Sequence, residues 1–344
     1  MTALLPDPAV ESSKDPLLSV LICSRNPKRD YLKAVLDALF CQTLPLDRWE
    51  LILVDNGSSP AIEVDLHWHP HARVVVEPES GILAARLRAI QEARAELLCF
   101  FDDDTPPCAD YLEFGVSVAD SHPWLGAWGA ALIAGKFEVP VPEWSKPFLH
   151  MLALRNEKGN YWSNMEDWRT IPYSGGMVFR RAVGREFGCW VEANRNARLL
   201  GRKADELLSH EDIALAKMAY RLDLGTGIFE RLQLGHFIPA SRLEPQYLCR
   251  LSEGFGYSGI LSKWINGENY LPKQKGRLEW IFDWVKNARR PAFARACLRA
   301  DRRGARRALR FVAEQMNVGR LPAARSAKSF EFPTPELAAG KHCI

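Results

Sequence analysis

The stretch LLCFFDDD, residues 97–104, places a short apolar run directly before three consecutive aspartates. Five continuous apolar residues are typical of a strand buried on both faces, as the strands of covered parallel sheets are. Such a strand, ending in carboxylates, predicts a buried sheet with its polar chemistry at one edge. Residues 17–23 and 51–54 are two further apolar runs, and residues 73–76 are predicted to form another strand.

Helical segments separate these predicted strands. Residues 31–39 and 82–95 carry apolar side chains at helical spacing. The alternation predicts an α/β fold with a mostly parallel central sheet and flanking helices, followed by a helical basic C-terminal region. In such sheets ligands bind beyond the carboxyl ends of the strands. Here those ends carry Ser24-Arg25-Asn26, Asp55-Asn56 and residues 77–81 and 102–104.

The bulk composition is that of a globular protein with a full core: 344 residues, 47% of them hydrophobic and 25% charged. A net charge of +3 gives no reason to expect a nucleic-acid partner. The eight cysteines form no C-x-x-C pair, which argues against a zinc or redox motif and favours a reducing compartment. Residues 1–15 lack the apolar core of a signal peptide, and the most apolar window, 124–135, is too short to span a bilayer. We therefore expect a cytoplasmic protein.

The three aspartates predict a metal site. In an extended chain Asp102 and Asp104 share one side and Asp103 faces the other. Two carboxylates about 4 Å apart repel by about 4 kcal/mol at an effective dielectric near 20, so a cation is expected between them. Oxygen ligands suit Mn²⁺ or Mg²⁺, with phosphates and water completing the shell. The alternative is a solvated acidic turn or a helix N-cap.

Four other positions are candidates for binding or chemistry. Asp55 ends a strand and can bind a base or ribose, although an Asx-turn is the commoner role. Gly81 opens a helix whose free N–H groups, with Arg86, suit a phosphate; an ordinary helix with a surface arginine is the alternative. Glu211-Asp212 begins another helix and can supply a general base, although the helix dipole alone favours acids there. His236 follows downstream, and a lone histidine is more often structural than a ligand.

Together these segments resemble family 2 glycosyltransferases of the GT-A fold, over residues 17–260. The processive-synthase signature Gln-x-x-Arg-Trp is absent, and Cys23-Ser24 stands where a Pro-Thr pair is common. The matching motifs are SVLICSRN (19–26), QTLP (42–45), VDNGS (54–58), GILAAR (81–86), FDDD (101–104), SGGMVFRR (174–181), Glu211-Asp212 and His236.

The resemblance implies a role for each matched residue. Asp212 is the expected catalytic base, with Glu211 beside it. Asp102, Asp104 and His236 are the expected ligands of Mn²⁺ or Mg²⁺, the metal of the Asp-x-Asp motif. Gly175 and Gly176 line the acceptor side, where Trp162 is our choice for contact with a sugar ring. The donor-binding residues implied are Ser24, Arg25, Asn26, Asp55, Gly81, Arg86, Asp102 and Asp103.

The reaction implied is an inverting transfer of one sugar from a nucleoside-diphosphate sugar, with UDP favoured, to a hydroxyl of a glycan or lipid-linked acceptor. Cell-envelope or exopolysaccharide assembly is the pathway it suggests. The alternatives are a catalytically inactive nucleotide- or sugar-binding relative, or a sugar nucleotidyltransferase, which would want a Gly- and Arg-rich loop where Ser24-Arg25-Asn26-Pro27 stands.

We divide the chain into five segments. Residues 273–328 hold sixteen Lys or Arg and four Asp or Glu, so they either lie on the anionic inner face of a membrane or form a solvated helical face. The segments are a loose lead-in (1–16), a nucleotide-sugar-binding half (17–120), an acceptor-binding half (121–245), the helical basic region (246–328) and a loose tail (329–344).

Overall fold

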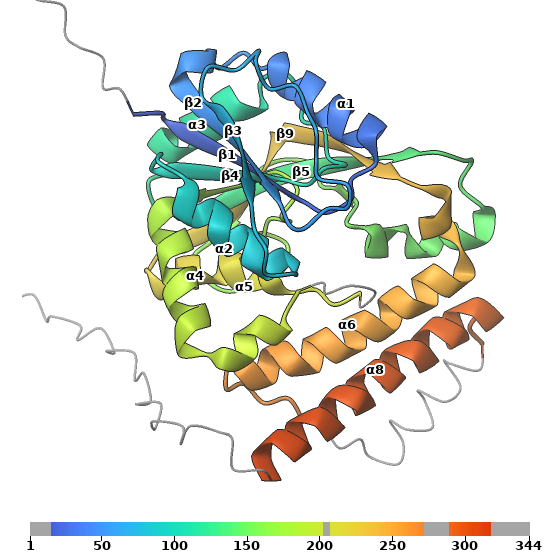
Figure 1. Cartoon of the computed structure of the whole chain (residues 1–344). Coiled ribbons are helices and arrows are strands. Elements are labelled where there is room, and N and C mark those ends of the chain that lie inside the picture. The colour runs from blue at the N-terminus through green and yellow to red at the C-terminus, as the bar shows by residue number, and fades with distance from the viewer. Residues whose placement is uncertain (1–14, 202–206, 272–288, 318–344) are drawn as a thin grey trace, which may run out of the picture.

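The central sheet begins with four parallel strands, which confirm the apolar runs of the sequence (Figure 1). The structure, a computed structural model, describes residues 15–201, 207–271 and 289–317, so the predictions for 1–14, 273–288 and 318–344 lie outside it. The strands pair in the order β3-β2-β1-β4. Their bounds are β1 (Leu18–Ser24), β2 (Trp49–Asp55), β3 (Ala72–Val76) and β4 (Leu97–Phe101).

The second part of the chain extends the same sheet. Strand β8 (Met177–Arg180) lies antiparallel between β4 and β5 (Leu125–Phe137), and β9 (Gly225–Ile238) runs parallel to β5. Strands β1 to β5 and β9 therefore point one way, whereas β6 to β8 point the other. The fold is thus α/β with a mostly parallel central sheet, as predicted. The two short strands are β6 (Arg155–Asn156), beside β5, and β7 (Tyr161–Ser163), beside β9.

Helices cover both faces of the sheet because alternate strand residues point to opposite sides. Leu21 and Cys23 of β1 belong to the apolar cluster under α2, α4 and α5, whereas Val20 and Ile22 belong to the cluster under α1 and α3. The helices of these layers are α1 (Arg29–Phe40), α2 (Ile82–Glu92), α3 (Tyr111–Ser121), α4 (Arg181–Ala193) and α5 (Glu211–Arg221). Short 3₁₀ turns join them: η1 (Leu46–Arg48), η2 (Glu143–Leu152), η3 (Arg195–Leu199) and η4 (Ala240–Leu243).

Two long helices, α6 (Pro245–Ile265) and α8 (Ala292–Asn317), pack side by side next to this sheet (Figure 1). Their backbones touch, because a methyl group at Gly256 would overlap the carbonyl of Asp301 and one at Gly304 would overlap that of Glu253. Only glycine permits such an approach. Within the described ranges, no helix combines the length and the apolar character that crossing a bilayer requires.

A buried carboxylate ties β2 to its neighbours at the end of the sheet opposite the aspartates. Glu50 is fully buried; it accepts hydrogen bonds from Ser19 Oγ at 2.7 Å, from Arg73 Nη1 at 2.7 Å and from the Arg94 amide at 2.7 Å. Burial alone would raise the pKa of Glu50, but these hydrogen bonds outweigh it and hold the pKa below its ordinary value.

We expect Glu50→Gln to lower the free energy of unfolding by about 2 kcal/mol at pH 7, because Arg73 and Arg94 lose the buried charge that they share, although Arg73 still faces Glu92 at 3.8 Å. Since the folded pKa of Glu50 is lowered, its stabilising effect is present above the unfolded pKa of about 4.3 and is lost as pH falls through the folded value. Urea unfolding at pH 7 and pH 3 checks both points. Glu96→Gln, on an exposed side chain, is the control; an equal loss in both variants would contradict the prediction.

Candidate active site

A cavity of about 910 Å³ opens at the carboxyl ends of the parallel strands. Its walls come from the loops after β1 and β4, the first turns of α2 and α5, and one side of α6. Of the residues singled out from the sequence, twelve line it: Ser24, Arg25, Asn26, Gly81, Arg86, Asp102, Asp103, Asp104, Gly175, Glu211, Asp212 and His236.

The loop after β1 forms one rim. Arg25 Nη1 donates to Ser80 Oγ at 2.7 Å, and Asn26 has a left-handed backbone with φ of +52°. The side chain of Asn26 accepts a hydrogen bond from the Ser59 amide at 2.9 Å, which holds this rim against the loop after β2. Asparagine tolerates that backbone better than most residues, so the local sequence suits the turn.

Asp55 lies outside the cavity lining. Its carboxylate accepts hydrogen bonds from the Ser58 amide at 2.8 Å and the Ile62 amide at 3.0 Å. Burial alone would raise the pKa of Asp55, but these bonds lower it overall. In this arrangement the side chain organises the loop after β2, the alternative that the sequence had left open. Asn56, the next residue, does line the cavity.

Helix α2 begins at the cavity wall. Gly81 precedes it with φ of +131°, and its amide donates to Asn56 Oδ1 at 2.8 Å. One turn further on, Arg86 is buried, with its side chain 6% exposed; Nη1 donates to Glu211 Oε1 at 3.0 Å and Nη2 lies 3.6 Å from Asp102 Oδ1. Arg86 therefore links the acidic groups on the two sides of the cavity. It is not the surface arginine of the alternative interpretation, because its side chain is buried.

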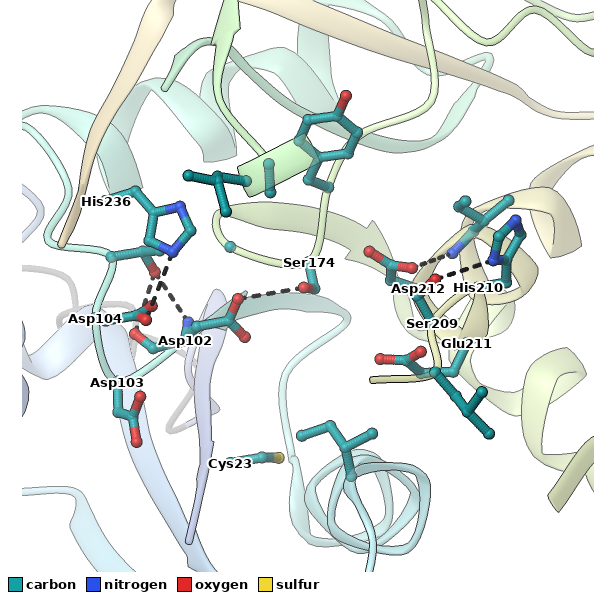
Figure 2. A pocket seen from close by; sticks show the side chains of 18 of the residues that line it. Cys23, Asp102, Asp103, Asp104, Ser174, Ser209, His210, Glu211, Asp212 and His236 are labelled. Atoms are coloured by element: carbon teal, nitrogen blue, oxygen red, sulfur yellow. Dashed lines mark hydrogen bonds and ion pairs between the residues drawn. The ribbon is translucent and has the colours of Figure 1, made fainter. Parts of the chain in front are cut away.

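The three aspartates follow β4 in a turn and not in the extended conformation predicted from the sequence. Thr105 closes the turn, because its amide donates to the Asp102 carbonyl at 3.2 Å and its Oγ1 accepts from the Asp102 amide at 3.0 Å. Asp103 still points away from the other two and accepts a hydrogen bond from Ser24 Oγ (Figure 2). All three nevertheless line the cavity.

Asp104 lies close to two side chains, His236 near the end of β9 and Arg242 in η4. Arg242 Nη1, from η4, lies 3.2 Å from Asp104 Oδ2 and 3.0 Å from His236 Nε2, while His236 Nε2 is 3.5 Å from the same carboxylate oxygen. An arginine has no acceptor, so Arg242 donates and Nε2 of His236 accepts.

Two of the three aspartates are harder to ionise than usual. Burial raises the pKa of Asp102, with repulsion from Asp104 adding to it and Arg86 opposing it. Burial likewise raises the pKa of Asp103 to about 6, although the hydrogen bond from Ser24 opposes the shift. Two half-buried acids of raised pKa beside the buried Asp104 favour a bound cation, because a cation would remove this penalty.

Glu211 and Asp212 face the aspartates from the start of α5 (Figure 2). His210, just before the helix, has a left-handed backbone with φ of +86°, and burial lowers the pKa of its imidazole. The Asp212 carboxylate accepts from the Ile213 amide at 2.8 Å, at the helix end where the dipole favours negative charge. The general base expected from the sequence thus lines the cavity and is half-buried.

The glycine pair lies between the two acidic groups, and only its first member lines the cavity. A methyl group on Gly175 would come within 3.4 Å of Asp102 Oδ2. Gly176, with φ of +87°, packs instead against Tyr111, whose hydroxyl donates to its carbonyl at 2.6 Å. Ser174 Oγ donates to Asp102 Oδ2 at 3.3 Å, so this segment holds one of the aspartates in place.

Trp162 lies away from the cavity. It sits on β7, half-exposed, with its ring stacked on Phe229 at 6.5 Å between centroids. The cavity is lined by other aromatic groups, of which the sequence did not single out Tyr173, Tyr247 and Phe255. Tyr247 and Phe255 recur at helical spacing with Leu251 on the side of α6 that faces the cavity, a pattern present in the sequence but indistinguishable there from a core stripe.

The predicted metal ligands fit Mn²⁺ or Mg²⁺ in chemistry and lie on one side of the cavity. Asp102 and Asp104 supply oxygen, the donor that both ions prefer, and His236 a nitrogen. Within the part of the chain that the structure describes, no three His, Cys, Asp or Glu side chains are grouped closely enough to hold a metal by themselves. Phosphate and water would have to complete the coordination.

Comparisons with known proteins found a family model and a curated relative that match part of the chain. Residues 19–181 match the model of glycosyl transferase family 2. Glycosyltransferase AglE of Haloferax volcanii is 30% identical over 132 residues, which are 37% of this chain and 41% of that protein. The chain therefore matches about two-fifths of the length of this curated relative.

Solved structures resemble the chain at low sequence identity. Mannosyltransferase PcManGT from Pyrobaculum calidifontis, in complex with GDP-Man and Mn²⁺, is 16% identical, with a TM-score of 0.48 over 90% of this chain and 82% of that one. TarS 1–349 of S. aureus, in complex with UDP, is 16% identical, with a TM-score of 0.42 over 88% and 91%.

Proposed function

Because residues 19–181 match the model of glycosyl transferase family 2, we propose that the protein transfers one sugar from a nucleoside-diphosphate sugar to a hydroxyl of a glycan or lipid-linked acceptor, with inversion. The observation that carries this proposal is the placement of Asp102 and Asp104 across one cavity from Asp212 (Figure 2). A donor between the two groups would have its phosphates at the first and its anomeric carbon open to a hydroxyl near the second.

In the proposed reaction Asp212 accepts the proton of the attacking acceptor hydroxyl. Arg86 fixes Glu211 and Asp102, and so keeps the two sides of the site in register. Asp102, Asp104 and His236 would hold Mn²⁺ or Mg²⁺, which supplies positive charge to the departing diphosphate when bound. The remaining polar residues of the rim, Ser24, Arg25, Asn26 and Gly81, would bind the nucleotide.

Several finer points belong to the same proposal. The UDP-sugar donor, the role of the protein in cell-envelope or exopolysaccharide assembly and its cytoplasmic location rest on the resemblance and the composition. So does the division into a donor half (17–120) and an acceptor half (121–245), which is supported by the cavity drawing its two acidic groups from these two segments. A catalytically inactive relative is the alternative that the experiment must address.

Thermal stabilisation by UDP, GDP, dTDP and CDP, each with and without Mn²⁺, tests the proposal. A ligand at a hundred times its Kd adds about 2.7 kcal/mol to the free energy of unfolding. We expect one nucleotide to raise the Tm in the presence of metal, and the matching nucleotide-sugar to release its diphosphate when an acceptor is added. A stabilising nucleotide without turnover on any acceptor would indicate the inactive relative.

The exposed side of α8 supports peripheral contact with an anionic membrane. Arg303 and Arg307 pair with Glu253 of α6, at 3.1 Å and 3.7 Å. Among the described residues, no close ion pair joins the other exposed arginines of the helix to a carboxylate, although Asp301 lies near enough to Arg302 to interact with its charge. These arginines follow one another at helical spacing, so their charges share one face: Arg295, Arg299, Arg302, Arg306 and Arg310.

We expect the full chain to sediment with vesicles containing phosphatidylserine, and to do so less as salt is raised. Each arginine near such a surface contributes about 1 kcal/mol, so three removals should weaken binding about 100-fold. The α8 variant combines Arg299→Gln, Arg302→Gln and Arg306→Gln; the control combines Arg48→Gln, Arg185→Gln and Arg221→Gln, which are also exposed. Retention of vesicle binding by the α8 variant, or an equal loss of binding in the control, would contradict this prediction.

A further inference from the structure

Arg242 occupies the space between two of the predicted metal ligands. Its Nη1 atom lies 3.2 Å from Asp104 Oδ2 and 3.0 Å from His236 Nε2. The hydrogen bond to Nε2 uses the lone pair of the imidazole, which is the same lone pair that would bind a metal. The Arg242 guanidinium therefore cannot stay in this position when a metal ion is coordinated by these two atoms.

Arg242 differs from the other guanidinium that neutralises an aspartate of the turn. Arg86 is fixed in helix α2, 6% exposed, and bound to Glu211 at 3.0 Å as well as facing Asp102. The Arg242 side chain is 23% exposed and extends into the cavity from the short turn η4 (Ala240–Leu243), beside Tyr247. A long side chain on such a turn can leave Asp104 by rotating its own torsions, without moving a strand or a helix.

We propose that Arg242 is a resident cation that balances Asp104 in the free protein, gives up this place to the metal ion, and then binds the diphosphate of the donor. The inference rests on the proposed function. It adds a phosphate-binding residue that the sequence motifs did not indicate. Once displaced, the guanidinium remains in the cavity, and a diphosphate is the group there whose oxygens match its planar set of donors.

The two halves of the proposal have effects of opposite sign, which makes them separable. Removing the guanidinium takes away the group that competes with a metal for Asp104 and His236, so Arg242→Gln should bind Mn²⁺ alone more tightly, by about tenfold, the size of one hydrogen bond to a charged group. The same variant should bind the Mn²⁺ complex of a nucleoside diphosphate about tenfold more weakly. If Arg242 merely supported the fold, its replacement would weaken the binding of Mn²⁺ alone and of the Mn²⁺–nucleotide complex alike.

The experiment measures Mn²⁺ binding to the full chain by electron paramagnetic resonance, first without nucleotide and then with UDP or GDP. Arg242→Lys keeps the charge and should remain close to the original protein in both titrations. The matched control is Arg231→Gln, because Arg231 also lies on the β9 side and pairs with a carboxylate, Asp110 at 2.7 Å, but does not line the cavity. The Tm of each variant shows that it is folded.

Unchanged or weaker binding of Mn²⁺ alone by Arg242→Gln would overturn the idea of a resident cation, and unchanged nucleotide binding would overturn the phosphate contact. These outcomes are distinct from failure of the proposed function. If no nucleoside diphosphate binds the original protein, the proposed function fails, while the titration with Mn²⁺ alone still decides whether Arg242 competes for the site.

Discussion

Replacing Asp104 by asparagine should lower sugar transfer by about 10²–10³-fold, the range seen when one electrostatic group that stabilises a transition state is removed. The side chain is 9% exposed and faces the cavity, with Arg242 at 3.2 Å and His236 at 3.5 Å. Asparagine keeps its shape but removes the charge that a divalent cation requires. We therefore expect the dependence of nucleotide binding on Mn²⁺ to weaken together with turnover.

Stability should change much less than activity in this variant. Asp104→Asn deprives Arg242 of a charged partner, but it also removes repulsion from two neighbouring carboxylates. We expect the free energy of unfolding to change by less than about 2 kcal/mol. Steady-state rates and urea unfolding, measured on the same preparation, compare the loss of activity with the change in stability. Asp110→Asn, on a carboxylate paired with Arg231 outside the cavity, is the control and should keep its rate. Normal turnover by Asp104→Asn would remove the metal assignment.

The second large effect is expected from Asp212→Asn, which should lower kcat by about 10²–10⁴-fold because the acceptor hydroxyl loses its base. Binding of the nucleotide with Mn²⁺ should be unchanged, since Asp212 lies across the cavity from the aspartate turn (Figure 2). Loss of the carboxylate from the first turn of α5 costs only about 0.3–1 kcal/mol of stability.

A separation of kcat from nucleotide affinity is the diagnostic result for Asp212. It is measured by following the release of diphosphate at saturating donor and by titrating the nucleotide independently. The control is Asp223→Asn, just beyond the end of α5 and outside the cavity lining. If Asp212→Asn instead weakened nucleotide binding and left kcat intact, the residue would belong to the donor site, and Glu211 would become the candidate base.

The strands could be predicted because their sequence signal is local and redundant. Every residue of β1 and β4 is buried, so the continuous apolar runs marked them clearly. Strand β8, four residues inserted antiparallel between β4 and β5, had no comparable signal, because its neighbours come from distant parts of the chain. The general location of the site followed from one rule, that the carboxyl ends of parallel strands meet at one edge.

The pairings within the site could not be predicted in the same way. Arg86 and Glu211 are 125 residues apart in sequence, and nothing near either residue indicates the other. Arg242 had no motif at all, since its position beside Asp104 results from the path of β9 and η4. Asp55 matched a motif, yet its hydrogen bonds go to its own loop. A motif names a residue type at a position, whereas its partners are set by the folded chain.

The glycine contact between α6 and α8 has a consequence for the order in which the site is assembled during synthesis. The cavity wall that carries Leu251 and Phe255 belongs to α6, and the opposite side of this helix is covered by α8, backbone against backbone at Gly256 and Gly304. When the nascent chain has emerged from the ribosome up to residue 265, every carboxylate of the site is present, but the side of α6 that packs against α8 is still exposed. Helix α8 must therefore be synthesised before α6, the wall on the acceptor side of the cavity, is packed on both sides.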